Sequence, residues 1–484
     1  MVKEYLERED KYDVGAEFVL PDLGVDSTDR VETTTMQLKA TYYDTSEGDL
    51  RRHRITLRRR TGGSDDGWHL KLPAGPARTE LQLPAQSRAV PRELSTLLLG
   101  VRQGRKLVPV VTLETTRVSH VLQAADGGVR AEIADDTVRV VPAPSAPDLE
   151  ASAPTGWREV EVELGPAGDS DLLEALGRRL IEAGAEASAS VSKSTRALGE
   201  TGSVARPSFS GLAASVDDYL VKQYDAIVAG DLALRRDINA IHSTRVAIRR
   251  LRSTLRSFAA LFEPEDADHL QSELSWYADQ LGAVRDLDVT RSRLNARLSE
   301  LPRELVVGDI SQRFESDFTE AREAAYRRLR RAMSSKRYLA VLTLLDQWRQ
   351  DPPYTAAATS GEEATTFVSS AEKAMLKRLT RALQPGADVE LLHRARRAEK
   401  RYRYAHELAE PAGGKKDAIL AEAKALQDLL GEFQDSVTSD DVLRRLAASA
   451  RATGREDRFT YGVLIGQDLE TQRRIRMQLE REYG

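Results

Sequence analysis

Two hydrophobic patterns follow one another along the chain. From the start to about residue 164, apolar residues often stand at every second position, as at 68–73 and 159–164. This alternation is typical of β-strands, whose successive side chains point to opposite faces of a sheet. From about Leu212 the alternation ends and apolar residues recur at helical spacing. We therefore predict an α+β multidomain protein, with a strand-rich domain over 1–200, a linker over 201–211 and an all-α domain over 212–484.

The polar positions of the first domain are mostly charged, and the charges sort by sign. Acidic rows lie at 7–9 and 159–163, and cations at 54–60, Lys71, Arg117 and Lys193. For one strand alone, a charged face in water is the ordinary arrangement. Because at least six strands share the pattern, we predict a closed antiparallel barrel with its charged face inward. Carboxylates there would suit Mg²⁺ or Mn²⁺, and the cations would suit a chain of phosphates.

An ordered set of motifs in this domain resembles the CYTH family, the triphosphate tunnel metalloenzymes. The motifs are E-R-E-D-K at 7–11, Y-Y-D-T at 42–45, L-R-R-R at 57–60, W-H-L-K-L-P at 68–73, Arg117, E-V-E-V-E at 159–163 and S-K at 192–193. The resemblance covers about residues 1–200 and implies an eight-stranded antiparallel tunnel that binds a linear triphosphate with Mg²⁺ or Mn²⁺. Members of the family hydrolyse inorganic triphosphate or thiamine triphosphate, or cyclise ATP.

The resemblance also implies roles for individual residues. The expected catalytic residues are Glu7, Glu9, Lys11, Arg58, Arg60, Lys71, Arg117 and Lys193. The expected metal ligands are Glu7, Glu9, Glu159, Glu161 and Glu163. Glu80, Glu132 and Asp135 are expected to complete the lumen. Two departures from the family are V-S-H after Arg117, where an aromatic residue is common, and a proline-rich insertion at 141–147. Neither removes a charged residue of the expected lumen.

The second domain contains many segments with helical periodicity. We predict helices at 212–229, 238–262, 266–301, 310–334, 337–350, 365–383, 388–410, 416–432 and 437–482, the last with breaks. The stretch D-P-P-Y-T-A-A-A-T-S-G at 351–361 divides the domain into halves of about 212–350 and 362–484. The simplest architecture is a pair of pseudo-symmetric helical bundles.

Each half carries the same pair of motifs. H-S-T-R-V-A-I-R-R-L-R at 242–252 matches H-R-A-R-R-A-E-K-R-Y-R at 393–403, and L-G-A-V-R-D at 281–286 matches L-G-E-F-Q-D at 430–435. On a helix, offsets 0, 3, 7 and 10 share one face, which here carries a histidine and a row of cations. For one copy, a solvated charged face is the ordinary explanation. The duplication favours a shared site for a polyanion, because guanidinium groups fit phosphate oxygens.

This half resembles the CHAD family, the conserved-histidine α-helical domain, over about residues 205–484. The resemblance implies that the domain binds inorganic polyphosphate along a basic pore or groove between its halves. The implied binding residues are His242, Arg245, Arg249, Arg250, Arg252, His393, Arg396, Lys400, Arg401 and Arg403. Each histidine is open to two interpretations, a pH-tuned ligand contact or a hydrogen bond to the protein. Asp286 and Asp435 are expected to anchor arginines.

Composition limits the remaining possibilities. The chain of 484 residues has a net charge of −5 and no cysteine, which excludes disulfides and thiolate chemistry. The start has no apolar core typical of a signal peptide, and no run of 18 or more apolar residues occurs. We therefore expect a cytoplasmic protein, or one associated with polyphosphate granules, and no membrane partner.

The leading hypothesis is a divalent-metal-dependent triphosphatase with a polyphosphate-binding second domain. Its substrate would be inorganic triphosphate or a related compound such as ATP or thiamine triphosphate. One alternative is a non-catalytic polyphosphate-binding or granule-targeting protein, and another is an adenylate cyclase that uses the same tunnel. Nucleic-acid binding is disfavoured, because the first basic helix has no interleaved aromatic residue and the second has only Tyr402 and Tyr404.

Overall fold

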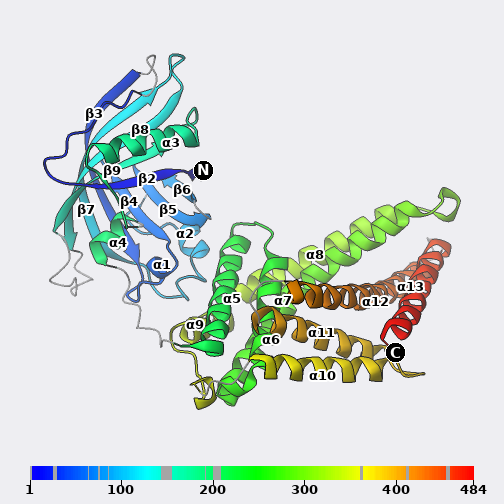
Figure 1. Cartoon of the computed structure of the whole chain (residues 1–484). Coiled ribbons are helices and arrows are strands. Elements are labelled where there is room, and N and C mark those ends of the chain that lie inside the picture. The colour runs from blue at the N-terminus through cyan, green and yellow to red at the C-terminus, as the bar shows by residue number, and fades with distance from the viewer. Residues whose placement is uncertain are drawn as a thin grey trace. The chain divides into compact units, whose positions relative to one another are not determined.

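The chain folds into two compact units, Met1–Ala205 and Arg206–Gly484 (Figure 1). The first unit contains the strands and the second is helical, which confirms the predicted α+β multidomain class. The computed structural model describes residues 3–24, 30–63, 65–74, 77–84, 87–142, 155–190, 192–199, 209–359, 364–409, 414–453 and 458–483.

One antiparallel sheet organises the first unit. Its strand order is β1-β6-β5-β4-β3-β7-β8-β9-β2-β10. The strands are β1 (Lys3–Glu7), β2 (Glu9–Val14), β3 (Arg30–Asp44), β4 (Thr56–Thr61), β5 (Gly67–Ala74), β6 (Ala77–Pro84), β7 (Val108–Gln123), β8 (Val129–Pro142), β9 (Gly156–Leu164) and β10 (Glu186–Ala187). Short helices α1 (Asp49–Arg52), α2 (Arg92–Leu97) and α4 (Lys193–Leu198) and the longer α3 (Ser170–Glu182) accompany the sheet.

The N-terminal segment reaches both ends of this sheet. β1 and β2 are separated only by Arg8, yet β1 pairs with β6 and β2 pairs with β9. Chain continuity at Arg8 therefore brings together strands from opposite ends of the order. The family resemblance implied eight strands, and the sequence pattern placed 7–11 in one strand. The described sheet has ten strand segments instead, because the first strand divides at Arg8 and the two-residue β10 is added, and its ladders do not close into a ring.

Alternation along the strands separates an apolar face from a charged one. Ile133 on β8 and Val160 and Val162 on β9 are fully buried, and they pack with Leu172 and Leu176 of α3. The amphipathic helix α3 lies across the sheet in Figure 1. Its N-terminus is capped by Asp169, whose carboxylate accepts the Leu172 N–H at 2.9 Å. With one face covered by α3, the charged alternate positions of the same strands point into the hollow of the sheet.

The second unit is built from long helices. They are α5 (Gly211–Arg235), α6 (Ile241–Ser257), α7 (Pro264–Glu300), α8 (Ile310–Met333), α9 (Lys336–Gln350), α10 (Ala364–Ala382), α11 (Val389–Ala409), α12 (Gly414–Thr453) and α13 (Phe459–Tyr483). Single turns of 3₁₀ helix occur at Ala259–Leu261, Arg303–Leu305 and Ala356–Thr359. The break predicted between 432 and 437 is wrong, because α12 runs through it without interruption.

Three apolar clusters hold these helices together. One joins α5, α6, α7 and α9 with the end of α8, and it includes the fully buried Ile248, Leu251 and Leu255 of α6. A second joins α10, α11, α12 and α13. The third joins the C-terminal part of α7 and the N-terminal part of α8 to α12 and α13. The two predicted helical halves are therefore packed against each other. In the described part of the chain, every helix is too short or too polar to span a membrane.

Candidate functional site

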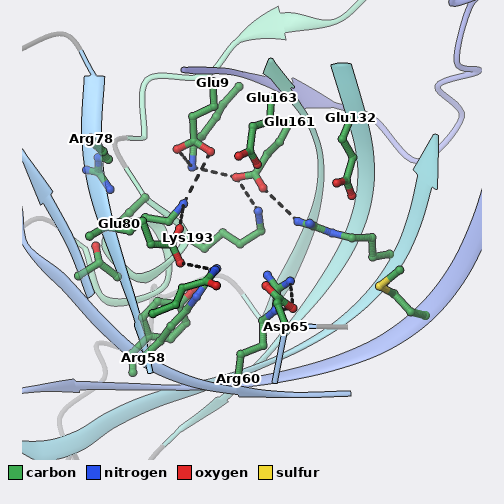
Figure 2. A pocket seen from close by; sticks show the side chains of 18 residues that line it. Glu9, Arg58, Arg60, Asp65, Arg78, Glu80, Glu132, Glu161, Glu163 and Lys193 are labelled. Atoms are coloured by element: carbon green, nitrogen blue, oxygen red, sulfur yellow. Dashed lines mark hydrogen bonds and ion pairs between the residues drawn. The ribbon is translucent and has the colours of Figure 1, made fainter. Parts of the chain in front are cut away.

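The hollow of the sheet contains a charged cavity of about 260 Å³ (Figure 2). Predicted site residues in its lining are Glu9, Lys11, Arg58, Arg60, Lys71, Arg117, Glu161, Glu163 and Lys193. Three carboxylates and two guanidinium groups face each other across this space, with further residues of both signs among them. Glu9 on β2 and Glu161 and Glu163 on β9 gather on one side, and Arg58 and Arg60 extend from β4 on the other. Such an arrangement can hold an anion and a cation side by side.

Glu161 is the centre of the acidic side. Its carboxylate lies 2.8 Å from Lys11 Nζ, 2.7 Å from Lys193 Nζ and 3.1 Å from Arg117 Nη2. Burial would raise the pKa of Glu161, but the three cations outweigh burial and hold this pKa well below its usual value. Glu161 is therefore ionised. Lys11 also lies 3.2 Å from Glu9, so this lysine bridges two strands through their carboxylates.

Asp136 is a fully buried residue beside the cavity lining that the sequence analysis missed. Its carboxylate accepts two hydrogen bonds from Arg117 and lies 3.0 Å from Lys193 Nζ. Burial would raise the pKa of Asp136, but Lys193 and Arg117 outweigh burial and lower it. The expectation for Asp135 is wrong, because its carboxylate turns to the other face of β8 and binds Arg158. Alternation from Glu132, which does line the cavity, points to position 136 rather than 135.

Glu159 lies behind the cavity rather than in its described lining. One carboxylate oxygen contacts Lys193 Nζ at 2.5 Å, and the other accepts the Trp157 indole N–H and lies 3.5 Å from Arg196. Glu159 thereby fastens β9 to α4, which carries Lys193 and Arg196. With Asp136 and Glu161 it forms an acidic group whose ligand oxygens lie within 4.8 Å of one another. The Lys193 ammonium already contacts all three carboxylates.

The carboxylates that line the cavity suit a hard divalent cation better than the group of Asp136, Glu159 and Glu161 does. Glu163 lines the cavity with Glu9 and Glu161, and only oxygen ligands are offered, as Mg²⁺ and Mn²⁺ prefer. Burial raises the pKa of Glu163; Lys71 opposes this effect, while Glu9, Glu132 and Glu80 add to it. Carboxylates whose mutual repulsion raises a pKa are stabilised when a cation joins them.

The remaining predicted residues complete both sides. Arg58 Nε is buried and has no hydrogen-bond partner among the described residues, as expected for a donor that binds an anionic ligand. Arg60 Nε donates to Asp65 at 2.9 Å. Glu80 and Glu132 line the cavity as expected, and Ser119, from the V-S-H departure, donates to Glu132. The backbone of Glu7 pairs with that of Arg78, but the Glu7 side chain lies outside the described residues. Residues 143–147 of the proline-rich insertion also lie outside them.

A second cavity, of about 370 Å³, lies within the helical unit. It is lined by residues of α6, α7, α11 and α12, two helices from each half. Six predicted residues line it: His242, Arg245, Arg249, His393, Arg396 and Lys400. Arg285 and Arg293 of α7 add two cations that the sequence analysis did not select. Asp286 and Asp435 line it as well, and Asp286 accepts from Arg245 at 2.7 Å, which confirms its anchoring role.

The two histidines of this cavity have different surroundings. His393 Nδ1 lies 2.9 Å from Gln434 Oε1, so this ring is hydrogen-bonded to the protein. Burial lowers the pKa of His242, and Arg285, Arg249 and Arg245 lower it further. The pKa of Lys400 falls to about 7 because of burial and because Arg396 and Arg249 repel its charge. The cavity therefore concentrates more positive charge than its own carboxylates neutralise.

Four predicted residues lie outside the described lining of the helical cavity: Arg250, Arg252, Arg401 and Arg403. Arg250 binds Glu407 at 3.0 Å, and Arg403 donates to Gln427 at 3.0 Å. The pKa of Arg252 and that of Arg401 are lowered by burial and then by neighbouring arginines, which include Arg256 and Arg397 for both. Predicted binding residues that share one helical face therefore do not all line the same cavity.

The aromatic residues of the second basic helix are not available to stack on bases. Tyr402 and Tyr404 are buried, and the Tyr404 hydroxyl accepts from Arg249 Nε at 2.9 Å.

Sequence comparisons match the two units to two domain families. The CYTH domain model matches residues 7–198, and the CHAD domain model matches residues 218–444. The chain is a CYTH–CHAD protein. The uncharacterized protein Rv2226 of Mycobacterium tuberculosis is 37% identical to this CYTH–CHAD protein over 499 residues, which cover 98% of this chain and 95% of the relative.

Two solved structures are similar to part of the chain. PptA from Streptomyces chartreusis has 21% identity and a TM-score of 0.46, over 57% of this chain and 99% of that chain. The CHAD domain from the plant Ricinus communis has 24% identity and a TM-score of 0.42, over 56% of this chain and 92% of that chain.

Proposed function

We propose that the CYTH domain hydrolyses a linear triphosphate with Mg²⁺ or Mn²⁺ and that the CHAD domain binds inorganic polyphosphate. Proteins of the CYTH family are metal-dependent and act on triphosphate substrates. The observation that carries the proposal is that Glu9, Glu161 and Glu163 lie opposite Arg58 and Arg60 in the tunnel cavity. The phosphates of a triphosphate would lie against the arginines, and its divalent cation would lie against the carboxylates.

The cations of the cavity would bind and orient the phosphate chain. Arg58 Nε is buried and has no hydrogen-bond partner in the described part of the chain, and Arg60, Lys71 and Arg117 lie around the same space. Guanidinium groups donate paired hydrogen bonds to phosphate oxygens and keep their charge at any working pH. Fixed cations in a site that excludes water stabilise the charge that spreads over the transferred phosphoryl group.

Glu9, Glu161 and Glu163 would hold the metal. When bound, the metal would neutralise phosphate charge and act as a Lewis acid. Lys11 and Lys193 keep Glu9 and Glu161 ionised and in place, so these carboxylates are ready as ligands. Glu159 would support Lys193 from behind rather than bind the metal.

The CHAD cavity would take condensed phosphate. Arg245, Arg249, Arg285, Arg293, Arg396 and Lys400 face one space with only Asp286 and Asp435 as its carboxylates. Outside this space, Arg252 and Arg401 lie among further arginines, which would extend contact along a longer chain. A polyanion that joins these cations relieves their mutual repulsion and releases bound counterions.

A substrate panel tests the catalytic half. The full chain is incubated with triphosphate, thiamine triphosphate, ATP or long polyphosphate, with Mg²⁺, Mn²⁺ or a chelator, and released phosphate and cyclic AMP are measured. We expect metal-dependent phosphate release from triphosphate. Absence of phosphate release from every substrate with both metals would overturn the catalytic proposal, and cyclic AMP as the main product of ATP would replace it with cyclisation.

A binding measurement tests the other half. Calorimetric titration with long polyphosphate is expected to give a dissociation constant that rises with salt, as for any contact made by several ion pairs. The Arg249→Ala, Arg396→Ala double variant is expected to bind at least about tenfold more weakly. The matched control is Arg327→Ala, Arg330→Ala on α8, whose side chains are exposed and pair with Glu323 and Asp237. Equal weakening in both pairs would reject the cavity as the binding site.

A further inference from the structure

His69 is a buried imidazole beside the tunnel cavity that has no role in the function proposed above. It lies on β5, two residues before Lys71, and its side chain is 1% exposed. The described lining of the cavity includes Asp65, Lys71 and Glu80, but His69 is not part of it. Any effect of His69 on a ligand must therefore pass through these neighbours.

Both ring nitrogens of His69 face hydrogen-bond acceptors. Nδ1 contacts Oε1 of Glu80 on β6, and Nε2 lies 2.8 Å from the main-chain oxygen of Asp65. A carbonyl oxygen and an ionised carboxylate only accept, so with Glu80 ionised both contacts are hydrogen bonds only when both nitrogens carry a proton. The Gln82 amide nitrogen lies 3.4 Å from Nδ1 and also 3.4 Å from Glu80 Oε1, so it can donate to the carboxylate instead. The geometry is thus that of an imidazolium.

Each acceptor of His69 holds one cation of the cavity. The second carboxylate oxygen of Glu80 lies 3.7 Å from Lys71 Nζ. The Asp65 side chain accepts from Arg60 Nε at 2.9 Å and also contacts Nη2. His69 therefore fastens the turn between β4 and β5 to β6 and shares the charge of Glu80 with Lys71.

We propose that His69, as an imidazolium, is a positioning residue that sets Arg60 and Lys71 for the phosphate chain. The proposal rests on the proposed function of the tunnel, because it concerns how that cavity binds triphosphate. Without the imidazolium, the buried Glu80 carboxylate loses its closest partner and draws the Lys71 ammonium away from the cavity. The Asp65 turn is released at the same time, and Arg60 loses its fixed orientation.

The first test is His69→Gln, whose side chain is neutral and donates to one acceptor but not to both. We expect KM for triphosphate to rise about tenfold or more, the effect of losing a hydrogen bond to a charged group. We expect kcat to change less, because the variant leaves Arg58 and Arg117 of the cavity in place for the transition state. The control is His120→Gln on β7, whose ring contacts Thr33 instead. An unchanged KM in a folded His69→Gln protein would overturn the proposal.

A double variant separates positioning from simple support of the fold. Glu80→Gln removes the charge that attracts Lys71. His69→Gln, Glu80→Gln is therefore expected to bind triphosphate no more weakly than His69→Gln alone, so the two changes are non-additive. Additive losses in affinity would show that His69 does not act through Glu80.

The third readout does not depend on catalysis. In the full chain with ¹⁵N-labelled histidine, the His69 ring of wild type is expected to show two protonated nitrogens near neutral pH. Its signal is identified by its loss in His69→Gln. A neutral tautomer would overturn the proposal.

The two proposals fail in different ways. Calorimetric binding of triphosphate in Mg²⁺ measures affinity whether or not hydrolysis occurs. If wild type binds without hydrolysis and His69→Gln binds more weakly, the catalytic proposal fails and the role of His69 stands. If wild type hydrolyses triphosphate and His69→Gln keeps its KM, the role of His69 fails and the catalytic proposal stands.

Discussion

The guanidinium of Arg245 on α6 lies against Gly282 on α7. A Cβ atom at Gly282 would stand 3.5 Å from Arg245 Nη2, and one at Gly431 on α12 would stand 3.4 Å from Arg396 Nη2. The glycine of each L-G-x-x-x-D motif thus leaves the space that the arginine of the H-x-x-R motif fills. In the first repeat, the aspartate of the same motif then holds the guanidinium at 2.7 Å. This contact explains why two motifs on different helices are repeated as a pair.

A larger side chain at these glycines is expected to weaken polyphosphate binding. Gly282→Leu or Gly431→Leu would push the arginine out of place and raise the dissociation constant about tenfold. Alanine makes only an ordinary contact and adds helix propensity, so Gly282→Ala is expected to bind like wild type. Calorimetric titration with polyphosphate checks both. The control is Gly462→Leu on α13, where nothing lies within 4 Å of an added Cβ; weakening there to the same degree would contradict the explanation.

Removal of the Asp136 carboxylate is expected to cost both stability and activity. Asp136 is fully buried and neutralises Arg117 and Lys193. Asp136→Asn leaves two buried cations short of a partner, which typically costs about 3 kcal/mol of unfolding free energy. Phosphate release from triphosphate is expected to fall as well, because Arg117 and Lys193 lose their orientation. Denaturant unfolding and initial rates provide the two measurements.

The neighbouring residue supplies the control for Asp136. Asp135 has the same chemistry and also binds an arginine, Arg158, but on the other face of β8. Asp135→Asn is therefore expected to lower stability by a smaller amount and to leave kcat and KM for triphosphate unchanged. A loss of activity equal to that of Asp136→Asn would mean that the face assignment does not decide function.

Metal affinity is expected to distinguish Glu163 from Glu159. Glu163 lines the cavity among other carboxylates, whereas both Glu159 oxygens are occupied by Lys193 and Trp157. Glu163→Gln is expected to raise the Mn²⁺ concentration for half-maximal activity about tenfold or more, the usual effect of weakening a metal site. Glu159→Gln is expected to leave this concentration unchanged and to lower the midpoint of thermal unfolding. A greater loss of metal affinity in Glu159→Gln would instead place the ion among Asp136, Glu159 and Glu161.

Much of the tunnel could be predicted from the sequence because strand alternation decides which side chains share a face. The rule succeeded for Glu161 and Arg58, which line one cavity. Applied strictly from Glu132, it would also have selected Asp136, which no motif marked. It could not reveal that the first strand divides at Arg8, because hydrogen-bond partners far along the chain decide that division.

The helical half was less predictable for a physical reason. Helical periodicity states which residues share a face, but not where a neighbouring helix crosses that face. Arg249 and Arg252 belong to one predicted row, yet only Arg249 lines the described cavity. Arg285 and Arg293 join the cavity from α7 because that helix packs beside α6. Long-range packing of this kind leaves no local signal in the sequence.

Glu399 places a carboxyl group in the core of the CHAD unit. It occupies the place in its motif that Ile248 has in the first repeat. Its side chain is fully buried, and neither oxygen has a hydrogen-bond partner among the described residues. Burial raises the pKa of Glu399 to about 7, although Arg403, Lys400 and Arg396 oppose the rise. The neighbouring Lys400 has its pKa lowered to about 7, chiefly by burial.

These two shifts act on stability in different pH ranges. Between the usual value of 4.5 and about 7, folded Glu399 binds more protons than the unfolded chain, so its contribution to stability falls as pH rises. Between about 7 and the usual value of 10.5, unfolded Lys400 binds more protons than the folded chain, so its contribution rises with pH. Together they predict a local minimum of stability near neutral pH.

Glu399→Gln is expected to remove the first of these slopes. Relative to wild type, the variant should gain about 2–3 kcal/mol of unfolding free energy between pH 4.5 and about pH 8. Lys400→Gln should flatten the rise at alkaline pH. Urea unfolding of the full chain, followed by far-ultraviolet circular dichroism, measures both. If the unfolding free energies of Glu399→Gln and wild type differ equally at pH 4.5 and about pH 8, Glu399 is ionised in the folded state. The buried carboxylate would then need a cationic partner.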